Sequence, residues 1–143
     1  MRMRTRLAAA ATVGTAAVTA LLTPMTAHAD GGPVVEPTGT ICWEKNHGTP
    51  SVTVRMIWPQ KFPVTVLLDT IDGTAVAPDD YQAISGLKVT IPAGATDVTV
   101  PLSIVNDGIA EPDETFQVSL SQPSAGQIGK NPATVIIKDG SQP

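Results

Sequence analysis

The densest group of side chains that could do chemistry lies in the stretch Ile104–Phe116. It carries four carboxylates, Asp107, Glu111, Asp113 and Glu114, close together in the sequence. Carboxylate oxygens, helped by a few carbonyl groups, are the ligands that hard divalent cations prefer. Such a group of acids either faces water, each side chain by itself, or shares a bound cation. The function of the chain depends on which of these two arrangements is present.

The sequence on both sides of this acidic stretch predicts β-strands. Apolar and polar residues alternate there, a period of two that is typical of strands with one face in a core. The alternating apolar positions are Val98, Val100, Leu102 and Ile104 before the stretch, and Phe116, Val118 and Leu120 after it. The acidic stretch is therefore expected to be a loop that joins two strands.

The rest of the sequence predicts an all-β domain. Alternation and turn residues indicate seven strands with turn signals about every 8–12 residues, and no segment after residue 29 has a helical period. The expected strands are Thr40–Glu44, Ser51–Trp58, Val64–Asp69, Leu87–Ile91, Asp97–Val105, Thr115–Ser121 and Ala133–Lys138. We predict a seven-stranded antiparallel immunoglobulin-like β-sandwich over residues 40–143. A flexible entry over residues 30–39 precedes it, and residues 123–132 are expected to be irregular.

The first 29 residues have the features of a secretory signal peptide. Three arginines precede the uncharged apolar run Leu7–Leu22, and residues 27–29 read Ala-His-Ala, the small-x-small form of a cleavage site. The apolar run is short for a bilayer span. No second apolar run follows, so no transmembrane segment is expected in the mature chain. We expect a secreted, extracellular protein that is cleaved after Ala29.

Charge and cysteine content narrow the classes of partner. The nine basic side chains less the three arginines of the signal leave six, against thirteen acidic ones, which gives the mature chain a net charge of −7. This argues against a nucleic-acid partner, which would favour a basic face, and is compatible with divalent cations. The single cysteine, Cys42, excludes an intrachain disulfide and is expected to be a small buried residue in a strand.

Five motifs, in order along the chain, resemble the Calx-beta domain family. The run Asp72-Gly73-Thr74-Ala75 followed by Asp80-Tyr81 is similar to the family's "DGTA…DY" signature, and the others are Ile91–Gly94, Val105–Phe116, Val118–Pro123 and Ala133–Asp139. Together they cover about Thr40 to Gly140. The resemblance implies a seven-stranded sandwich which, in the calcium-binding members of the family, holds the ions where several loops meet at one end.

The resemblance also implies a set of metal ligands. Carried over position by position, these are Glu44, Asp80, Asp107, the backbone carbonyl of Ile109, Glu111, Glu114 and Asp139. Two departures reduce the set, because Asn106 stands where the family has an aspartate and the terminal acidic run here reads Asp139-Gly140-Ser141. We therefore expect one or two calcium ions, fewer than in the fullest sites of the family.

The function that follows is a secreted structural, adhesion or interaction module clamped by calcium, with another protein or a cell-surface component as its partner. The alternative is a sandwich that has lost calcium binding and serves as a plain protein- or carbohydrate-binding module. Residue content argues against an enzyme. The mature chain has one histidine, His47, and it has no G-x-S-x-G, H-E-x-x-H or P-loop motif.

Carbohydrate binding depends on exposed aromatic rings, and the mature chain has few. Trp58 continues the strand face of Val52, Val54 and Met56, and we expect it in the core together with Phe116. That leaves Trp43 and Phe62, too little for a stacking platform. An exposed pair of aromatic side chains on one face would restore this function as a candidate.

Overall fold

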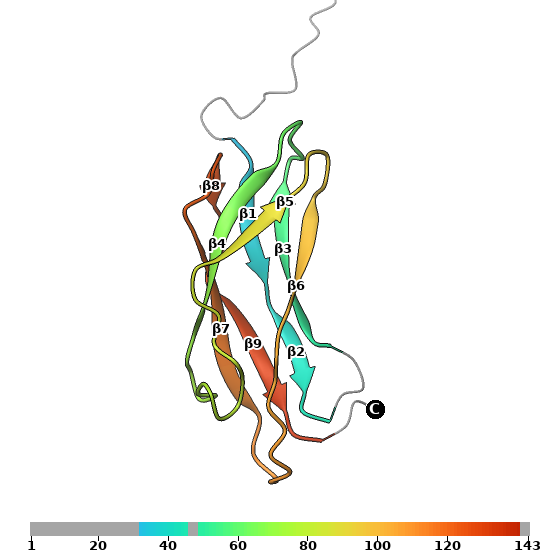
Figure 1. Cartoon of the computed structure of the whole chain (residues 1–143), viewed down its shortest axis with the longest axis vertical. Helices are drawn as coiled ribbons and strands as arrows, with labels where there is room; N and C mark the ends of the chain where they lie inside the picture. Colours follow the sequence, from blue (N-terminus) through green and yellow to red (C-terminus); the bar gives the residue numbers. More distant parts are fainter. Residues whose placement is uncertain (1–31, 46–48, 141–143) are drawn as a thin grey trace, which may run out of the picture.

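The computed structural model describes residues 32–45 and 49–140. The predicted signal peptide, residues 1–29, lies outside this range. The described residues form nine strands and no helix, arranged in two sheets that pack face to face (Figure 1). This confirms the predicted all-β sandwich. None of the described residues belongs to a helix long and apolar enough to cross a lipid bilayer.

The two sheets contain four and five strands. In spatial order, the first holds β6 (Asp97–Pro101), β3 (Ser51–Ile57), β1 (Val34–Thr38) and β8 (Gln127–Ile128). The second holds β2 (Thr40–Trp43), β9 (Ala133–Lys138), β7 (Glu114–Ser121), β4 (Val64–Ile71) and β5 (Leu87–Ile91). The sandwich is not wholly antiparallel as predicted, because β1 pairs with β8, and β2 with β9, in parallel.

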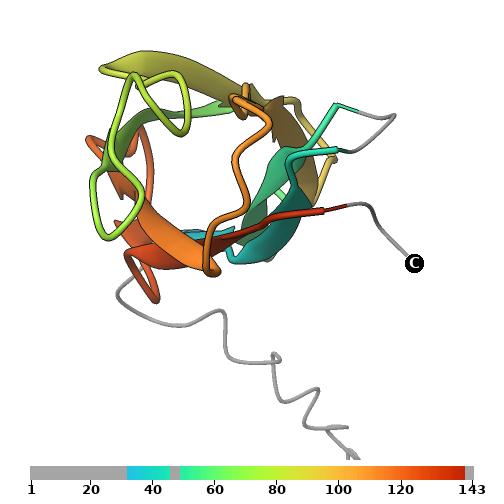
Figure 2. The same cartoon turned by 90° about the horizontal axis from the view of Figure 1, so that it is seen from below.

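The core lies between the sheets and is built from alternate residues of the strands (Figure 2). On β3 the buried positions are Val52, Val54 and Met56, as the period of two predicted. Cys42 is also buried, in agreement with its expected role, and burial raises the pKa of its thiol to about 11. A thiol with such a pKa stays protonated near neutral pH, so it behaves here as a small apolar side chain.

The predicted flexible entry over residues 30–39 is wrong for its second half, which forms β1 and begins the domain. Pro33, Val35 and Pro37 are all buried, so the alternation is present, but proline in two of the three positions conceals it. The Gly129 N–H donates to the Val35 carbonyl, so the backbone groups of Val35, and of Pro37 two residues on, point away from β3. Because β8 pairs with β1 only at Val34 and Val35, the missing N–H of Pro37 falls on an open edge.

The chain changes sheets between β1 and β2, at Gly39. A Cβ on Gly39 would lie 2.5 Å from the backbone oxygen of Thr134 on β9, a separation that forces a shift. Only glycine allows the chain to pass this close to β9. The crossing sends β2 into the second sheet, so that its last residues end beside the end of β9.

Two further expectations about the strands are corrected. Residues 123–132, expected to be irregular, contain the short strand β8. Trp58 was expected in the core, but its φ of 65° ends β3 and its side chain is 47% exposed. The left-handed conformation breaks the alternation, so the ring does not follow Met56 into the interior.

The strands run along the long axis, which gives the sandwich two different ends (Figure 1). The lower end in this view collects the β4–β5 loop, the β6–β7 loop and the last residues of β2 and β9. All the predicted metal ligands lie in these two loops, at the start of β7, or directly after β2 and β9. The upper end carries the shorter turns that join β3 to β4 and β5 to β6.

Candidate metal centre

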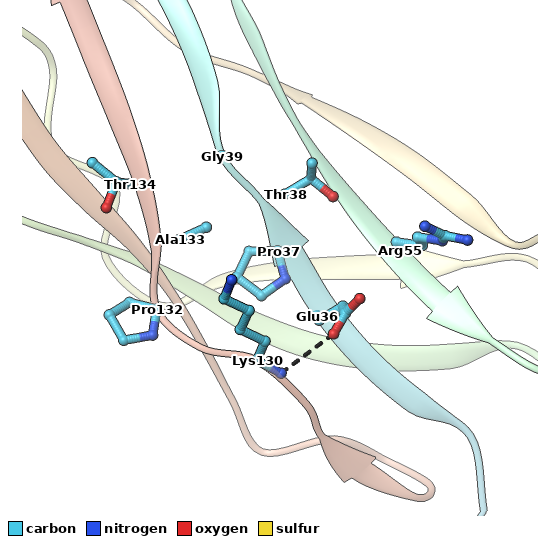
Figure 3. Close-up of a pocket in the computed structure, with 9 residues that line it drawn as sticks. All are labelled: Glu36, Pro37, Thr38, Gly39, Arg55, Lys130, Pro132, Ala133 and Thr134. Carbon is cyan, nitrogen blue, oxygen red and sulfur yellow. Dashed lines mark hydrogen bonds between the residues drawn. The ribbon is translucent and has the colours of Figure 1, made fainter.

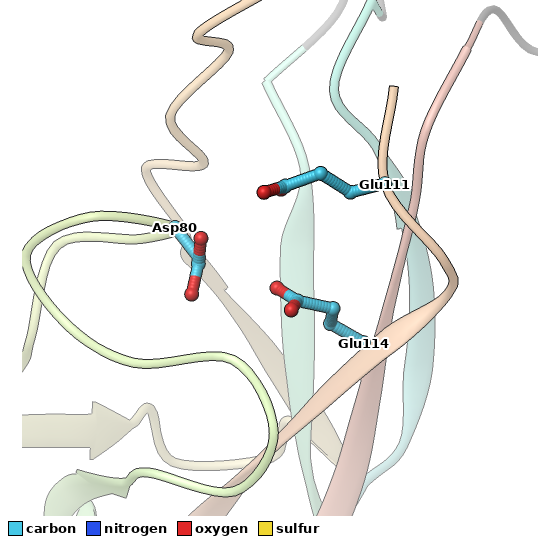
Figure 4. A group of neighbouring side chains, drawn as sticks. All are labelled: Asp80, Glu111 and Glu114. Atoms are coloured by element: carbon cyan, nitrogen blue, oxygen red, sulfur yellow. The ribbon is translucent and has the colours of Figure 1, made fainter. Parts of the chain in front are cut away.

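Three carboxylates from two loops meet at the lower end of the sandwich. One oxygen each of Asp80, Glu111 and Glu114 lies within 4.8 Å of the other two. Figure 4 shows the Glu111 and Glu114 side chains reaching from one side toward Asp80 on the other. Asp80 lies near the middle of the β4–β5 loop, Glu111 lies in the β6–β7 loop, and Glu114 is the first residue of β7. Residues more than 30 positions apart in the sequence are thus within reach of one ion.

The β4–β5 loop fixes Asp80 by hydrogen bonds that leave one of its oxygens available. The Val76 N–H donates to Asp80 Oδ2 at 2.6 Å, and the Asp80 N–H donates back to the Val76 carbonyl at 3.0 Å. The Val105 N–H donates to the Asp80 carbonyl at 2.9 Å, which ties this loop to the one that carries Glu111. Oδ1 is therefore the oxygen that Asp80 can offer to a cation.

The same loop is also attached to the start of β7, beside Glu114. The Thr115 N–H donates to Thr74 Oγ1 at 2.8 Å, and the Ala75 N–H donates to the Thr115 carbonyl at 2.9 Å. Next to Asp80, the Tyr81 ring is buried and stacks on Phe116 with ring centroids 3.9 Å apart. Its hydroxyl donates to Asp72 Oδ1 at 2.6 Å. The loop that carries Asp80 and the strand that carries Glu114 are therefore held together by hydrogen bonds and by the Tyr81–Phe116 stack.

The other predicted ligands surround this group at different distances. Asp139 Oδ2 accepts a hydrogen bond from the Glu111 N–H at 3.3 Å, which joins the end of β9 to the β6–β7 loop. Glu44 and Asp107 are close enough to affect the same carboxylates electrostatically. Ile109 donates its N–H to Asp107 Oδ1 at 2.7 Å, and its side chain is 61% exposed at the loop tip.

Asp113, the fourth acid of the stretch, is separated from the group. Its Oδ2 lies 2.5 Å from Lys138 Nζ, in an ion pair on the outer surface of β9. The same ammonium lies 5.8 Å from the centre of the Trp43 ring. Asp113 was not among the predicted ligands.

The pKa shifts indicate that the carboxylates of this group repel one another. Burial and the carboxylates of Asp139, Glu111 and Asp107 raise the pKa of Glu44. Burial raises the pKa of Glu111 and of Glu114 as well, and in both cases Asp80 adds to the effect. Carboxylates whose pKa values rise in this way are stabilised by any cation that lies among them.

A buried oxygen supports the interpretation of these residues as cation ligands. Glu44 Oε2 is shielded from solvent, and among the described residues it accepts no hydrogen bond. A buried carboxylate oxygen without a partner is costly, and a metal ion is one of the few groups that can satisfy it. The donor set, all oxygen and mostly carboxylate, fits calcium better than zinc or copper, which favour nitrogen and sulfur.

Comparison with known proteins identifies the family. The family model of the Calx-beta domain matches residues 35–141. The chain belongs to the Calx-beta family. The match begins inside β1, which agrees with a domain that starts before residue 40. No curated protein sequence matches the Calx-beta chain.

Solved structures share this Calx-beta fold. The apo form of the Calx CBD1 domain is 26% identical, with a TM-score of 0.65 over 75% of this chain and 98% of its own. The calcium-binding domain CBD12 of CALX1.1 is 28% identical, with a TM-score of 0.63 over 76% of this chain and 45% of its own. The CBD12 structure from CALX1.2 is 27% identical, with a TM-score of 0.66 over 73% of this chain and 43% of its own. The chain thus spans less than half of either CBD12 structure.

Sequence reasoning missed one residue of the Calx-beta site. Lys45 Nζ lies 3.3 Å from Asp139 Oδ1, and its charge lowers the pKa of Glu44. Lys45 follows the predicted ligand Glu44 directly, and the carbonyl of Gly140 accepts its N–H. The sequence does show a basic residue next to a predicted ligand. It does not show that Asp139 is its partner, because that follows from the pairing of β2 with β9.

A hollow on the flank of the domain contains none of the predicted ligands (Figure 3). It has a volume of about 460 Å³ and lies where β1 extends beyond β8, with Pro37 and Pro132 among its lining residues. The Lys130 N–H donates to Glu36 Oε2 across it at 3.3 Å. Prolines offer no N–H to an incoming strand, so this exposed edge is protected against pairing with another chain.

Proposed function

We propose that this Calx-beta domain binds calcium at the lower end of the sandwich and uses the ion as a structural clamp. The observation that carries the proposal is the convergence of Asp80, Glu111 and Glu114 within 4.8 Å. An ion among them would join the β4–β5 loop to the β6–β7 loop. Glu44 and Asp139 would extend the clamp to the ends of β2 and β9.

The size of the donor set favours one ion, with two as the upper limit. Calcium takes six to eight oxygens, and a carboxylate supplies one or two of them. Asp80, Glu111 and Glu114 therefore provide most of one coordination shell. A second ion would need Glu44, Asp107 and Asp139, together with the carbonyl of Ile109.

The proposed setting is extracellular, and the proposed role is a binding module without catalysis. Calcium sites that are occupied only at the millimolar concentrations outside cells suit an exported domain. The signal-like residues 1–29 support export. The solved relative described as a calcium-binding domain supports the choice of ion. Its partner would be another protein or a cell-surface component.

Titration calorimetry of the mature chain with calcium tests the site. Replacing Asp80 by asparagine is expected to weaken calcium binding by about tenfold or more, because one charged ligand is lost. Asparagine can still accept the Val76 N–H, so the loop should keep its shape. The matched control is Asp79→Asn, which removes the same charge one residue away from an exposed side chain. Equal losses in the two variants, or equal binding of magnesium, would contradict a specific site.

Lys45 is expected to compete with the ion. Its ammonium partly neutralises Asp139, so Lys45→Met should raise calcium affinity by about three- to tenfold. The same change should lower the melting temperature in chelator, because the acidic group loses its neighbouring cation. Lys88, exposed on β5, gives the control variant Lys88→Met. An affinity that falls in Lys45→Met would show that the lysine assists the site.

A further inference from the structure

The β6–β7 loop carries an aspartate followed by a glycine at its tip. This loop protrudes at the lower end in Figure 1, and residues 106–110 are all exposed. In an Asp-Gly step the main-chain nitrogen of the glycine can attack the aspartate carboxyl group, because glycine has no Cβ to shield the nitrogen or to restrict its rotation. The described part of the chain contains three such steps, Asp72-Gly73, Asp107-Gly108 and Asp139-Gly140. A fourth, Asp30-Gly31, lies outside it.

The Asp72-Gly73 step is held by its surroundings. The Tyr81 hydroxyl donates to Asp72 Oδ1 at 2.6 Å, which fixes the carboxyl group. The Gly73 N–H donates to the Ala75 carbonyl at 3.1 Å, and a Cβ on Gly73 would collide with the carbonyl of Thr115. The nitrogen and the carboxyl carbon of this step therefore cannot approach each other without breaking these contacts.

The Asp139-Gly140 step is held as well. Both oxygens of Asp139 are engaged, Oδ1 with Lys45 Nζ and Oδ2 with the Glu111 N–H, each at 3.3 Å. The Asp139 side chain is only 19% exposed. The Lys45 N–H donates to the Gly140 carbonyl at 3.1 Å, so the glycine is also tied to a neighbouring segment.

The Asp107-Gly108 step differs from both, because its hydrogen bonds are local and exposed. Asp107 Oδ1 accepts the Ile109 N–H at 2.7 Å, and Asn106 Oδ1 accepts the Gly108 N–H at 3.0 Å. The first of these bonds folds the Asp107 carboxyl group back over the Gly108 peptide unit, toward the nitrogen that would attack it. Beyond its chain neighbours, no atom of the described residues lies within 4 Å of the place a Cβ on Gly108 would take. The main chain therefore has room to rotate as ring closure requires.

We propose that Asp107 is the residue of this domain that converts spontaneously to isoaspartate. The Gly108 nitrogen forms a bond to Cγ of Asp107, and its proton leaves with a hydroxyl group of the carboxyl as one molecule of water. The product is a five-membered succinimide ring. A water molecule then opens the ring at either carbonyl. Opening at Cγ restores aspartate, and opening at the original main-chain carbonyl gives isoaspartate, so one water leaves, one enters and no oxidant is needed.

The conversion would alter the metal centre, a consequence that rests on the proposed function. In isoaspartate the main chain runs through Cβ and Cγ, which makes it one carbon longer and the side chain one carbon shorter. Asp107 lies close enough to Glu44 and Glu111 to raise the pKa of both, so its displacement takes a charge away from the metal ligands. A calcium ion on the Asp107 carboxylate would hold the group in place, so the calcium-free form is the one that reacts. The loop would then record the time that the domain has spent without calcium.

The test is incubation of the mature chain in chelator for several weeks, at physiological temperature and mildly acidic pH. Methyl transfer by an isoaspartyl methyltransferase measures the total isoaspartate, and mass-spectrometric peptide mapping locates it. At least about ten times more isoaspartate is expected at Asp107 than at Asp72 or Asp139. The peptide with Asp30 is resolved separately. Equal amounts at the three described steps, or none at Asp107, would overturn the proposal.

Variants of the same loop confirm the attacked residue. Asp107→Glu keeps the carboxylate, but attack on it would have to close a six-membered ring, which forms more slowly. Isoaspartate in the loop peptide should therefore fall about tenfold or more. The control is Asp113→Glu, at an acid of this loop that is not followed by glycine, and its isoaspartate should be unchanged. A signal that persists in the Asp107→Glu loop peptide would overturn the proposal.

A calcium series separates this proposal from the proposed function. If only the calcium-free form reacts, calcium at about ten times its dissociation constant should slow the conversion about tenfold. An unchanged rate in a chain that binds calcium by calorimetry would overturn the protection of Asp107 by the ion. Absence of calcium binding would contradict the proposed function, while the peptide map obtained in chelator would still decide whether Asp107 is the residue that converts.

Discussion

Replacing Glu111 and Glu114 together by glutamine is expected to raise the melting temperature of the domain in chelator at pH 7.5. It should also abolish the further rise that calcium produces in the unmodified chain. Burial and neighbouring acids raise the pKa of both carboxyl groups, so their ionised forms are held in the folded state at a cost. Glutamine keeps the length of the side chain and removes its charge.

The pH dependence in chelator follows from the same shifts. A raised pKa in the folded state means that these groups favour folding when they are protonated. That contribution is complete below their ordinary pKa of 4.5 and is lost as the pH rises through the higher folded values. The calcium-free chain should therefore melt at a higher temperature at pH 5 than at pH 7.5. The double variant should lose a large part of this difference.

Calcium supplies the larger effect. Free calcium at about 100 times its dissociation constant adds about 2.7 kcal/mol to the free energy of unfolding. For a domain of this size that raises the melting temperature by roughly 10 °C. Scanning calorimetry in chelator, calcium and magnesium measures it, with Glu36→Gln as the control because Glu36 lies on the flank, outside the metal centre. A calcium shift that survives in the double variant would place the ion elsewhere.

Replacing Phe116 by alanine is expected to lower the free energy of unfolding by about 3–5 kcal/mol. The Phe116 side chain is fully buried and stacks on Tyr81, so its removal leaves a cavity in the core. Phe116→Leu should cost much less, because it keeps most of the volume. Ile41→Ala, at a side chain 53% exposed, should change stability by less than about 0.5 kcal/mol.

Urea unfolding with and without calcium measures the Phe116 variants. Since Tyr81 follows Asp80 directly, we expect Phe116→Ala to weaken calcium binding as well as the fold. A variant that loses stability but keeps full calcium affinity would show that the loop hydrogen bonds, such as the one from Val76 to Asp80, position the ligand without the stack. A cost below about 2 kcal/mol would contradict the importance of the buried Phe116 ring for the packing of the core.

The sequence was sufficient for the fold class because most strands follow a clean period of two. The acidic loop between β6 and β7 could be located for the same reason, since its flanking strands are unambiguous. The joining of Asp80 to Glu111 and Glu114, by contrast, depends on pairing between distant segments, which spacing alone does not reveal. The family resemblance supplied that connection for six side chains, of which three meet closely in the structure.

The failures have particular physical causes. β1 was missed because proline, normally a strand breaker, is tolerated at Pro37 where the edge is open. Trp58 was misplaced because a single left-handed residue reverses the side to which a side chain points. Lys45 was missed because its partner Asp139 is distant in the sequence. Of these three, only the role of Lys45 depends on a residue from a distant strand.

The parallel pairing of β2 and β9 gives the domain a mechanical property. β2 lies near the start of the domain and β9 at its end, in register from Thr40 with Val135 to Trp43 with Lys138. Tension applied between the two ends of the domain would pull these strands past each other. Their hydrogen bonds would then bear the load together in shear, and would not open one after another as in a hairpin.

Glu44 and Asp139 lie at the matching ends of the two strands, so an ion held between them would act as a cross-link at the end where the load enters. The rate of forced unfolding should consequently fall with calcium concentration.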